Sequence, residues 1–198
     1  MIRKLTSTEL RFAAQLLARG MRDNPLHIQA FGPQAEHRGR ALARFFEPVL
    51  HRAFNRGSVY GLVDDDVLVG VYVETPPGSC KLGIVEKLKI FPSIYFGNPL
   101  TASVRVLNWT GEWSRRDPAE PHWHFGPVAV DASLQGRGIG STMLSDFCSR
   151  MDSRKAVSYL ETDKSVNVRF YEKFGFKVLA QAEVLGLPNW FMSREPSL

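Results

Sequence analysis

Three glycines at alternate positions, Gly136, Gly138 and Gly140, lie between a β-rich run and a run with helical periodicity. Glycine has no side chain, so a ligand can approach the main chain closely at these positions. The first N–H groups of the following helix have no partner within the helix, and they carry the positive end of its dipole. The segment therefore predicts a site for an anionic ligand, and a diphosphate is the first candidate.

Two other nucleotide-binding loops do not match this segment. A dinucleotide fingerprint G-x-G-x-x-G would need glycine where Ser141 or Met143 stands. A Walker loop needs Gly-Lys-Ser/Thr after four spacer residues, and the segment contains no lysine. Neither class of nucleotide site is expected here.

The run Gln135-Gly-Arg-Gly-Ile-Gly140 resembles the Q/R-x-x-G-x-G/A loop with which the GNAT superfamily of N-acetyltransferases binds acyl-coenzyme A. Downstream, Asn167-Val-Arg-Phe-Tyr-Glu-Lys-Phe-Gly-Phe176 is similar to the family's N-x-x-x-Y-x-x-x-G-F signature. The run Pro121 to Val128 resembles the strand that enters the loop, with His124 where tyrosine is often found. The resemblance is specific from about residue 120 to 178 and only architectural before it.

The resemblance implies acetyl-CoA as co-substrate and assigns its contacts. Backbone groups of Val128, Ala129 and Val130 would pair with the pantetheine amides as an added strand would. The Arg137 side chain could reach a phosphate, although an arginine in a polar turn is often simply solvated. The other expected cofactor residues are Gln135, Gly136, Gly138, Ile139, Gly140, Ser141, Thr142, Asn167 and Tyr171.

The resemblance also places Tyr171 as the general acid. Asn167 and Tyr171 are four residues apart and share one helix face, while Val166, Phe170 and Phe174 form a neighbouring stripe expected to face the core. A phenol with a pKa of about 10 can protonate a departing coenzyme A thiolate. We expect Tyr171 to point into the cleft.

An acceptor amine must lose a proton before it attacks, so a base is needed. Glu161 is the first candidate because it shares a strand face with Val157 and Tyr159, although a surface carboxylate is an equally good interpretation. His122 and His124 share a face of the other strand and have the better intrinsic pKa. Glu74 is a weaker candidate.

Direct transfer needs neither a metal nor a covalent enzyme intermediate, and we expect no metal site. Cys80 and Cys148 are the only cysteines, and neither lies in an evident reactive motif, so a ping-pong route is disfavoured. Cys148 is expected to fill apolar space in a helix.

The remaining elements predict an α/β (α+β layered) fold. The expected order is helices around 10–21 and 42–50, a hairpin of 59–63 and 67–73, a helix at 107–115, a strand at 122–130, a helix at 138–151, a strand at 157–162, a helix at 165–174, and strands at 176–184 and 190–192. The GNAT resemblance implies a central mixed sheet, flanked by helices, in which the parallel strands at 124–130 and 157–162 splay apart.

Length and composition predict a single domain over residues 1–198. The net charge, 25 − 20 = +5, suits an anionic cofactor but does not select one. No stretch is apolar enough to cross a bilayer, so we expect a cytoplasmic protein with no membrane partner, and a homodimer is left open.

Acceptor specificity is expected from the least regular regions. These are 21–31, with Asp23, Asn24, Pro25 and His27, which resembles the family's substrate-side loop, and the aromatic residues Phe91, Tyr95 and Phe96. The acceptor is expected to be a small amine, with a protein or peptide amine as the alternative. A noncatalytic acyl-CoA sensor is a second hypothesis. Nucleic-acid binding is a third, prompted by the arginines at 38, 40, 44, 52 and 56, which a solvated helix face explains more simply.

Overall fold

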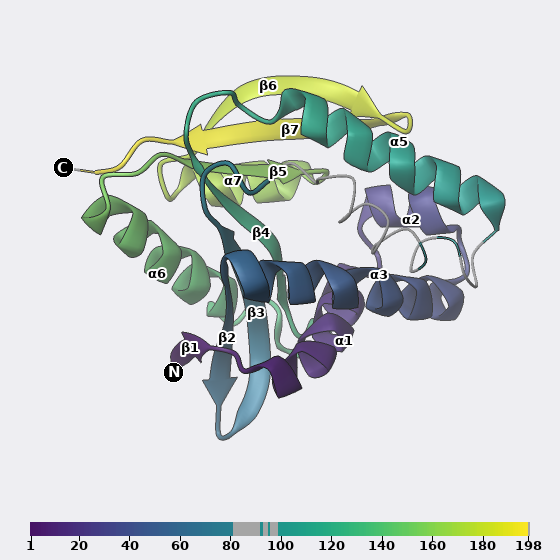
Figure 1. Ribbon diagram of the computed structural model, residues 1–198, viewed down its shortest axis with the longest axis horizontal. Coiled ribbons are helices and arrows are strands. Elements are labelled where there is room, and N and C mark those ends of the chain that lie inside the picture. Colours follow the sequence, from purple (N-terminus) through teal and green to yellow (C-terminus); the bar gives the residue numbers. More distant parts are fainter. Residues whose placement is uncertain (81–91, 93–94, 96–98, 198) are drawn as a thin grey trace.

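The computed structural model describes residues 1–80, 92, 95 and 99–197 (Figure 1). One seven-stranded mixed sheet runs through it in the order β1-β2-β3-β4-β5-β7-β6. Its strands are β1 (Ile2–Lys4), β2 (Ser58–Asp64), β3 (Val67–Thr75), β4 (Trp123–Val130), β5 (Ser158–Thr162), β6 (Lys177–Val184) and β7 (Leu187–Arg194). The helices are α1 (Leu10–Met21), α2 (Pro25–Phe31), α3 (Ala35–Arg56), α5 (Leu100–Arg116), α6 (Ile139–Ser153) and α7 (Ser165–Glu172), with short 3₁₀ turns at Ser7–Glu9 and Ala132–Leu134.

The sheet divides between its two parallel strands. β4 and β5 pair only at Trp123↔Ser158 and His124↔Tyr159, although the structure describes both strands in full. Beyond that point β4 stays paired with β3 through Val130, and β5 stays paired with β7 through Thr162. In Figure 1 the β5–β7–β6 half accordingly runs across the view while β2 and β3 run down it. The expected splay between 124–130 and 157–162 is confirmed.

Alternation along the central strands builds two apolar layers. On β3, Val71 and Val73 pack with α1, α2, α3 and α5, whereas Tyr72 between them packs with α6 on the other face. On β4, Ala129 belongs to the first layer and Phe125 to the second. Helices therefore cover both faces of the sheet, as predicted.

Helix α1 lies unusually close to β4, and Gly20 is the reason. A Cβ atom at this position would sit 2.6 Å from the Val130 carbonyl oxygen and 2.8 Å from the Ala129 Cβ. Glycine thus lets the end of α1 approach the part of β4 that has lost β5 as a neighbour.

Most predicted elements are confirmed, and the structure differs from the prediction at the following places. Residues 25–31 form the helix α2 where a loop was expected, and residues 2–4 form an edge strand that was not predicted. On α7 the predicted core stripe is wrong at Val166, which is 57% exposed, whereas Phe170 and Phe174 pack against the core beside the buried Val168 and Tyr171. Packing of this short helix on β5 and Phe176 turns Val168 and Tyr171 inward and leaves Val166 in solvent.

Arg38 does not belong to a solvated face. Its side chain is 4% exposed and donates to the carbonyls of Arg22 and Gly32 and to Asp23. It thereby holds the ends of α1 and α2 together, which gives this arginine a structural role. No helix among the described residues is long and apolar enough to cross a membrane.

We expect Gly20→Ala to destabilise the protein by about 1–3 kcal/mol, because a methyl group must displace either the Val130 carbonyl or the helix. Urea unfolding monitored by circular dichroism measures the change. The matched control is Gly111→Ala in α5, where a Cβ meets nothing within 4 Å; there the gain in helix propensity should stabilise by about 0.5–1 kcal/mol. Equal effects of the two substitutions would contradict the close approach of α1.

Candidate active site

The glycine loop opens directly onto the start of α6. Gly136 and Gly138 have φ of +80° and +83°, which L side chains rarely adopt, and a Cβ at either position would meet nothing within 4 Å. Gly138 is the N-cap of α6, and its carbonyl accepts from the Thr142 N–H at 3.0 Å. The amides of Ile139, Gly140 and Ser141 therefore form the first turn and have no acceptor within the helix, which is the arrangement that favours an anion at a helix start.

Side chains on either side of the loop fix its path. Asp131 accepts a hydrogen bond from the Ser133 N–H at 3.1 Å and pairs with Arg19 of α1 at 3.0 Å. The Gln135 amide donates to the carbonyls of Gly20 and Val130, both at 3.3 Å. Gln135, which is itself exposed, thus ties the loop to the ends of α1 and β4, and Arg137, Ser141 and Thr142 are exposed beside it.

The loop follows the unpaired part of β4. Val128, Ala129 and Val130 pair with Tyr72, Val71 and Gly70 of β3, which leaves the β5 side of this segment without a strand partner among the described residues. Val128 and Val130 pack toward α6, and Ala129 packs toward α1. The segment is a rigid strand with one free edge, the geometry that β-augmentation requires.

Tyr171 lies in the apolar layer beneath α7. Only 6% of its surface is exposed, and its ring lies 5.4 Å from Phe170 and 6.0 Å from Phe176. Burial raises the pKa of the Tyr171 hydroxyl, and the nearby Asp163 carboxylate raises it further. The phenol therefore stays protonated throughout the working pH range. On the same helix the Asn167 amide donates to Thr162 Oγ at 3.2 Å, which ties α7 to the end of β5.

His124 and Glu161, predicted separately as base candidates, form one pair. The Nε2 atom of His124 lies 2.6 Å from Glu161 Oε2, and the side chains are 20% and 7% exposed. Burial lowers the pKa of His124, but the charge of Glu161 and its hydrogen bond outweigh burial, so the pKa is raised. The pair spans the fork between β4 and β5, because His124 is the last paired residue of β4 and Glu161 lies two residues beyond its partner Tyr159.

Tyr159 connects this pair to a second histidine. Its ring lies 5.9 Å from His124 and 5.1 Å from His122, and its hydroxyl donates to the Arg116 carbonyl at 3.2 Å. His122 is turned toward Cys80 and Asp117 rather than toward Glu161. His122, which lies just before β4, and His124 on β4 therefore contact different groups of residues.

Glu74 belongs to a separate ionic network. It is 1% exposed, accepts from Arg150 Nε at 3.0 Å and also pairs with Arg154. Asp146, which accepts from the Tyr72 hydroxyl at 2.6 Å, also pairs with Arg150. A carboxylate held by two arginines beneath α6 is a poor base for an amine at the fork, so Glu74 is the least suitable of the candidates.

The expected substrate-side region lies next to the end of β5. The Asp163 carboxylate accepts from the Leu26 N–H at 2.8 Å and so fixes the first turn of α2 beside α7. His27 is buried against Phe46 and Trp109, and burial lowers its pKa. It is a neutral core residue, and Asp23 is paired with Arg22 and Arg38. Tyr95 is 45% exposed, while Phe91 and Phe96 lie outside the described residues.

Sequence reasoning missed Asp163 and Asp117. Asp163 immediately follows the strand at 158–162 and precedes α7, a position from which a carboxylate commonly reaches the ends of neighbouring elements. That position was the available signal for it. Asp117 follows α5 and contacts His122 across a turn, and no recognised spacing marks it.

Comparison with known proteins assigns the family. The model of the acetyltransferase (GNAT) family matches residues 25–176, which is more than half of the chain, so the chain belongs to this family. A Corynebacterium glutamicum structure described as histone acetyltransferase HPA2 and related acetyltransferase matches 100% of this chain and 97% of its own at 20% identity, with a TM-score of 0.73.

Two further structures share the fold at lower identity. An N-acetyltransferase named PaiA from Thermoplasma acidophilum, in complex with coenzyme A, matches 98% of each chain at 14% identity with a TM-score of 0.60. An aminoglycoside 6′-acetyltransferase type Ii matches 98% of this chain and 96% of its own at 18% identity with a TM-score of 0.57. At these identities the likeness concerns the fold, and it does not identify an acceptor.

We expect Glu161→Gln to lower the pKa of His124. The substitution removes the charge that stabilises the imidazolium and leaves the burial that opposes it. A proton NMR titration of the five histidine rings measures the pKa, with His124→Gln assigning the signal. The control is Glu172→Gln, an exposed carboxylate on α7, which should leave the value in place. An unchanged or higher His124 pKa in Glu161→Gln would show that the pair does not form in solution.

Proposed function

We propose that the protein is an acetyl-CoA-dependent N-acetyltransferase that transfers the acetyl group directly to an amine. The observation that carries the proposal is the continuity of two backbone sites. The free edge of β4 at 128–130 leads within a few residues into the free amides at the start of α6. An extended amide-containing arm and a diphosphate would be held by these two sites in that order. Family membership supports the same ligand.

The residues assigned to the cofactor fit this ligand. The main chain at Gly136 and Gly138 is open to close approach, and Arg137 stands exposed beside it as a cation for a phosphate. Acetyl-CoA supplies an activated thioester. The chain supplies orientation, and the unpaired N–H groups of β4 are placed to stabilise negative charge on the carbonyl oxygen during attack.

We assign proton removal to the pair at the fork. His124 is the more exposed member, and its Nε2–H donates to Glu161, so Nδ1 of the neutral ring is the atom that accepts the proton from the amine. Glu161 then stabilises the imidazolium, which is why the pKa of His124 is raised. The nitrogen lone pair forms the bond to the acetyl carbon as the carbon–sulfur bond breaks.

Tyr171 is assigned the proton that the departing thiolate requires. Burial and Asp163 keep the phenol protonated, so the donor is available at every pH at which the base can work. Its raised pKa also makes full transfer to sulfur less favourable than for a free phenol. Donation in the transition state by a positioned hydroxyl fits this balance better than a completed early transfer.

A small amine is our first assignment for the acceptor. The supporting observation is that α2 is tied to the end of β5 beside the fork, where the Asp163 carboxylate accepts from the Leu26 N–H. A protein or peptide amine is the alternative. The solved relatives include one named for histones and one named for aminoglycosides, so both kinds of acceptor occur on this fold. A noncatalytic acyl-CoA sensor is the second candidate function, although the His124–Glu161 pair favours an enzyme.

We expect Gly138→Val to abolish acetyl-CoA binding, because the side chain strains a φ of +83° and fills the approach to the α6 amides. Isothermal calorimetry measures the affinity. Gly186→Val in the β6–β7 turn is the matched control, since Gly186 has φ of +77° and equally open surroundings, so it carries the same backbone cost away from the loop. Unchanged affinity in folded Gly138→Val would place the cofactor elsewhere.

Turnover tests the activity itself. Release of free thiol from acetyl-CoA, measured against small amines, peptide N-termini and lysine peptides, should reveal at least one acceptor. With that acceptor, Tyr171→Phe should lower kcat by roughly 10²-fold at nearly unchanged acetyl-CoA affinity, the usual scale for a lost proton donor. The ring remains, so urea unfolding should show only a small change in stability.

These measurements distinguish the enzyme from the sensor and test the role of Tyr171. Tight acetyl-CoA binding without turnover of any amine would favour the sensor. A normal kcat in Tyr171→Phe, with chemistry shown to limit the rate, would remove Tyr171 from the proton path and leave His122, His124 or solvent as the source.

A further inference from the structure

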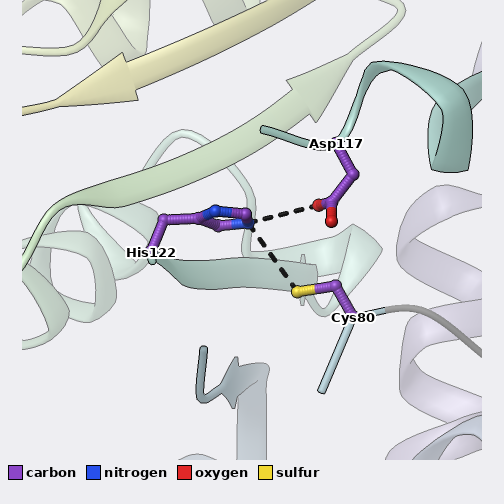
Figure 2. A group of neighbouring side chains, drawn as sticks. All are labelled: Cys80, Asp117 and His122. Carbon is purple, nitrogen blue, oxygen red and sulfur yellow. Dashed lines mark hydrogen bonds and ion pairs between the residues drawn. The ribbon is translucent and has the colours of Figure 1, made fainter. Parts of the chain in front are cut away.

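Three side chains with metal-binding atoms converge beside β4 (Figure 2). Cys80 Sγ lies 3.8 Å from His122 Nε2, and Asp117 Oδ1 lies 3.2 Å from the same nitrogen. All three atoms are within 4.8 Å of one another. The His122 and Asp117 side chains are 5% and 11% exposed, and Cys80 is partly buried, so most of the group is sheltered from solvent.

A hydrogen bond at Nδ1, the ring nitrogen that faces away from Cys80 and Asp117, sets the orientation of His122. Its Nδ1 lies 2.8 Å from the Glu120 carbonyl oxygen, which can only accept, so Nδ1 carries a hydrogen. Burial lowers the pKa of His122, but the hydrogen bonds to Asp117, Cys80 and the Glu120 carbonyl together outweigh it and raise the pKa to about 10, so Nε2 also carries a hydrogen in the metal-free protein. An ion that displaces this proton meets a lone pair directed toward Cys80 and Asp117. A backbone carbonyl that fixes the far nitrogen in this way is the usual support of a metal-binding histidine.

The same geometry argues against a nucleophilic triad. In a triad the carboxylate holds one ring nitrogen while the nucleophile faces the other. Here Cys80 and Asp117 both face Nε2, and the Glu120 carbonyl occupies Nδ1. The carboxylate cannot orient the ring for a thiol at the opposite nitrogen. This arrangement therefore does not support a ping-pong mechanism through a covalent intermediate on Cys80.

We propose that Cys80, Asp117 and His122 form a binding site for a divalent transition metal of the zinc type. Tetrahedral zinc with bonds of about 2.3 Å to sulfur and about 2.0 Å to nitrogen or oxygen places neighbouring ligand atoms roughly 3.3–3.5 Å apart. The observed 3.8 Å and 3.2 Å to His122 Nε2 are close to this spacing, and the Cys80 sulfur and the Asp117 carboxylate, which lie within 4.8 Å of each other, would complete it by side-chain movement. A thiolate and a carboxylate also neutralise the charge of the ion, whereas Mg²⁺ and Ca²⁺ prefer oxygen ligands alone.

The site would join three parts of the chain. Cys80 follows β3, Asp117 is the C-cap of α5, and His122 lies just before β4. Cys80 and His122 are 42 positions apart, so a bound ion would close a long loop at the base of the fork. Three protein ligands leave a fourth coordination position open. The Tyr159 ring contacts His122 on one side and His124 on the other, so it connects the metal ligands to the proposed base. The metal site would thus adjoin the proposed acceptor side.

Metal binding tests the proposal without reference to acetyl transfer. Protein freed of metal by a chelator under reducing conditions would be titrated with Zn²⁺ against a chromophoric zinc indicator, and with Co²⁺ as a spectroscopic probe. We expect one ion per chain, a thiolate-to-cobalt charge-transfer band, and a rise in Tm with Zn²⁺ concentration. Cys80→Ser and Asp117→Asn should each weaken Zn²⁺ binding by more than about 100-fold, since losing even a supporting residue costs about 10–100-fold.

The matched control is Cys148→Ala, which removes the other cysteine and should retain both the affinity and the cobalt band. Calorimetry with coenzyme A shows whether each variant is folded and keeps its cofactor site. The proposal is overturned if the metal-free protein binds neither ion, if Cys80→Ser binds Zn²⁺ as tightly as the parent protein, or if the cobalt band persists in Cys80→Ser and disappears in Cys148→Ala. None of these outcomes bears on acetyl transfer, so the two proposals fail separately.

Discussion

The structure depends on one interruption in hydrogen bonding, the separation of β4 from β5 after His124↔Tyr159. Buried backbone groups are normally paired, so an unpaired strand edge inside a sheet is costly unless a ligand or water satisfies it. The surrounding elements hold the two halves in place despite that cost. β3 and the close approach of α1 at Gly20 fix β4, while β7 and α7 fix β5.

The same interruption brings the chemical groups together. His124 and Tyr159 are the last paired residues, and the next residue on that face of β5 is Glu161, which reaches back to His124. Further along β4 the free edge leads into the glycine loop, whose conformation requires positive φ at Gly136 and Gly138. The proposed base therefore lies at the apex of the fork and the proposed phosphate site at its mouth, joined by one rigid strand.

The sequence predicted the parts of this arrangement that local rules determine. Gly136, Gly138 and Gly140 mark the loop because positive φ and close approach leave little choice of residue, and the strands around it have clear β patterns. Residues 165–174 were harder, because Val166, Phe170 and Phe174 form one apolar row and Val168 and Tyr171 another. Packing buries the second row, keeps Phe170 and Phe174 partly buried and leaves Val166 exposed. The helix α2 was missed because its seven residues are too few to show a clear helical repeat, although Pro25 at its start was a usable signal.

Long-range groupings could not be predicted. Glu161 and His124 were separate candidates. They form a pair only because β4 and β5 align His124 with Tyr159, which brings Glu161, two residues further along β5, within reach of His124. Cys80, Asp117 and His122 come from three segments with no recognised spacing, so their convergence is a property of the fold.

Amide hydrogen exchange with and without coenzyme A reports directly on the backbone groups at the fork and at the start of α6. We predict that coenzyme A slows exchange at Val128–Val130 and at Ile139–Ser141, with smaller changes elsewhere in the sheet. Saturation with coenzyme A, shown by calorimetry, without slower exchange in either segment would contradict the claim that this interrupted strand and the following helix hold the cofactor.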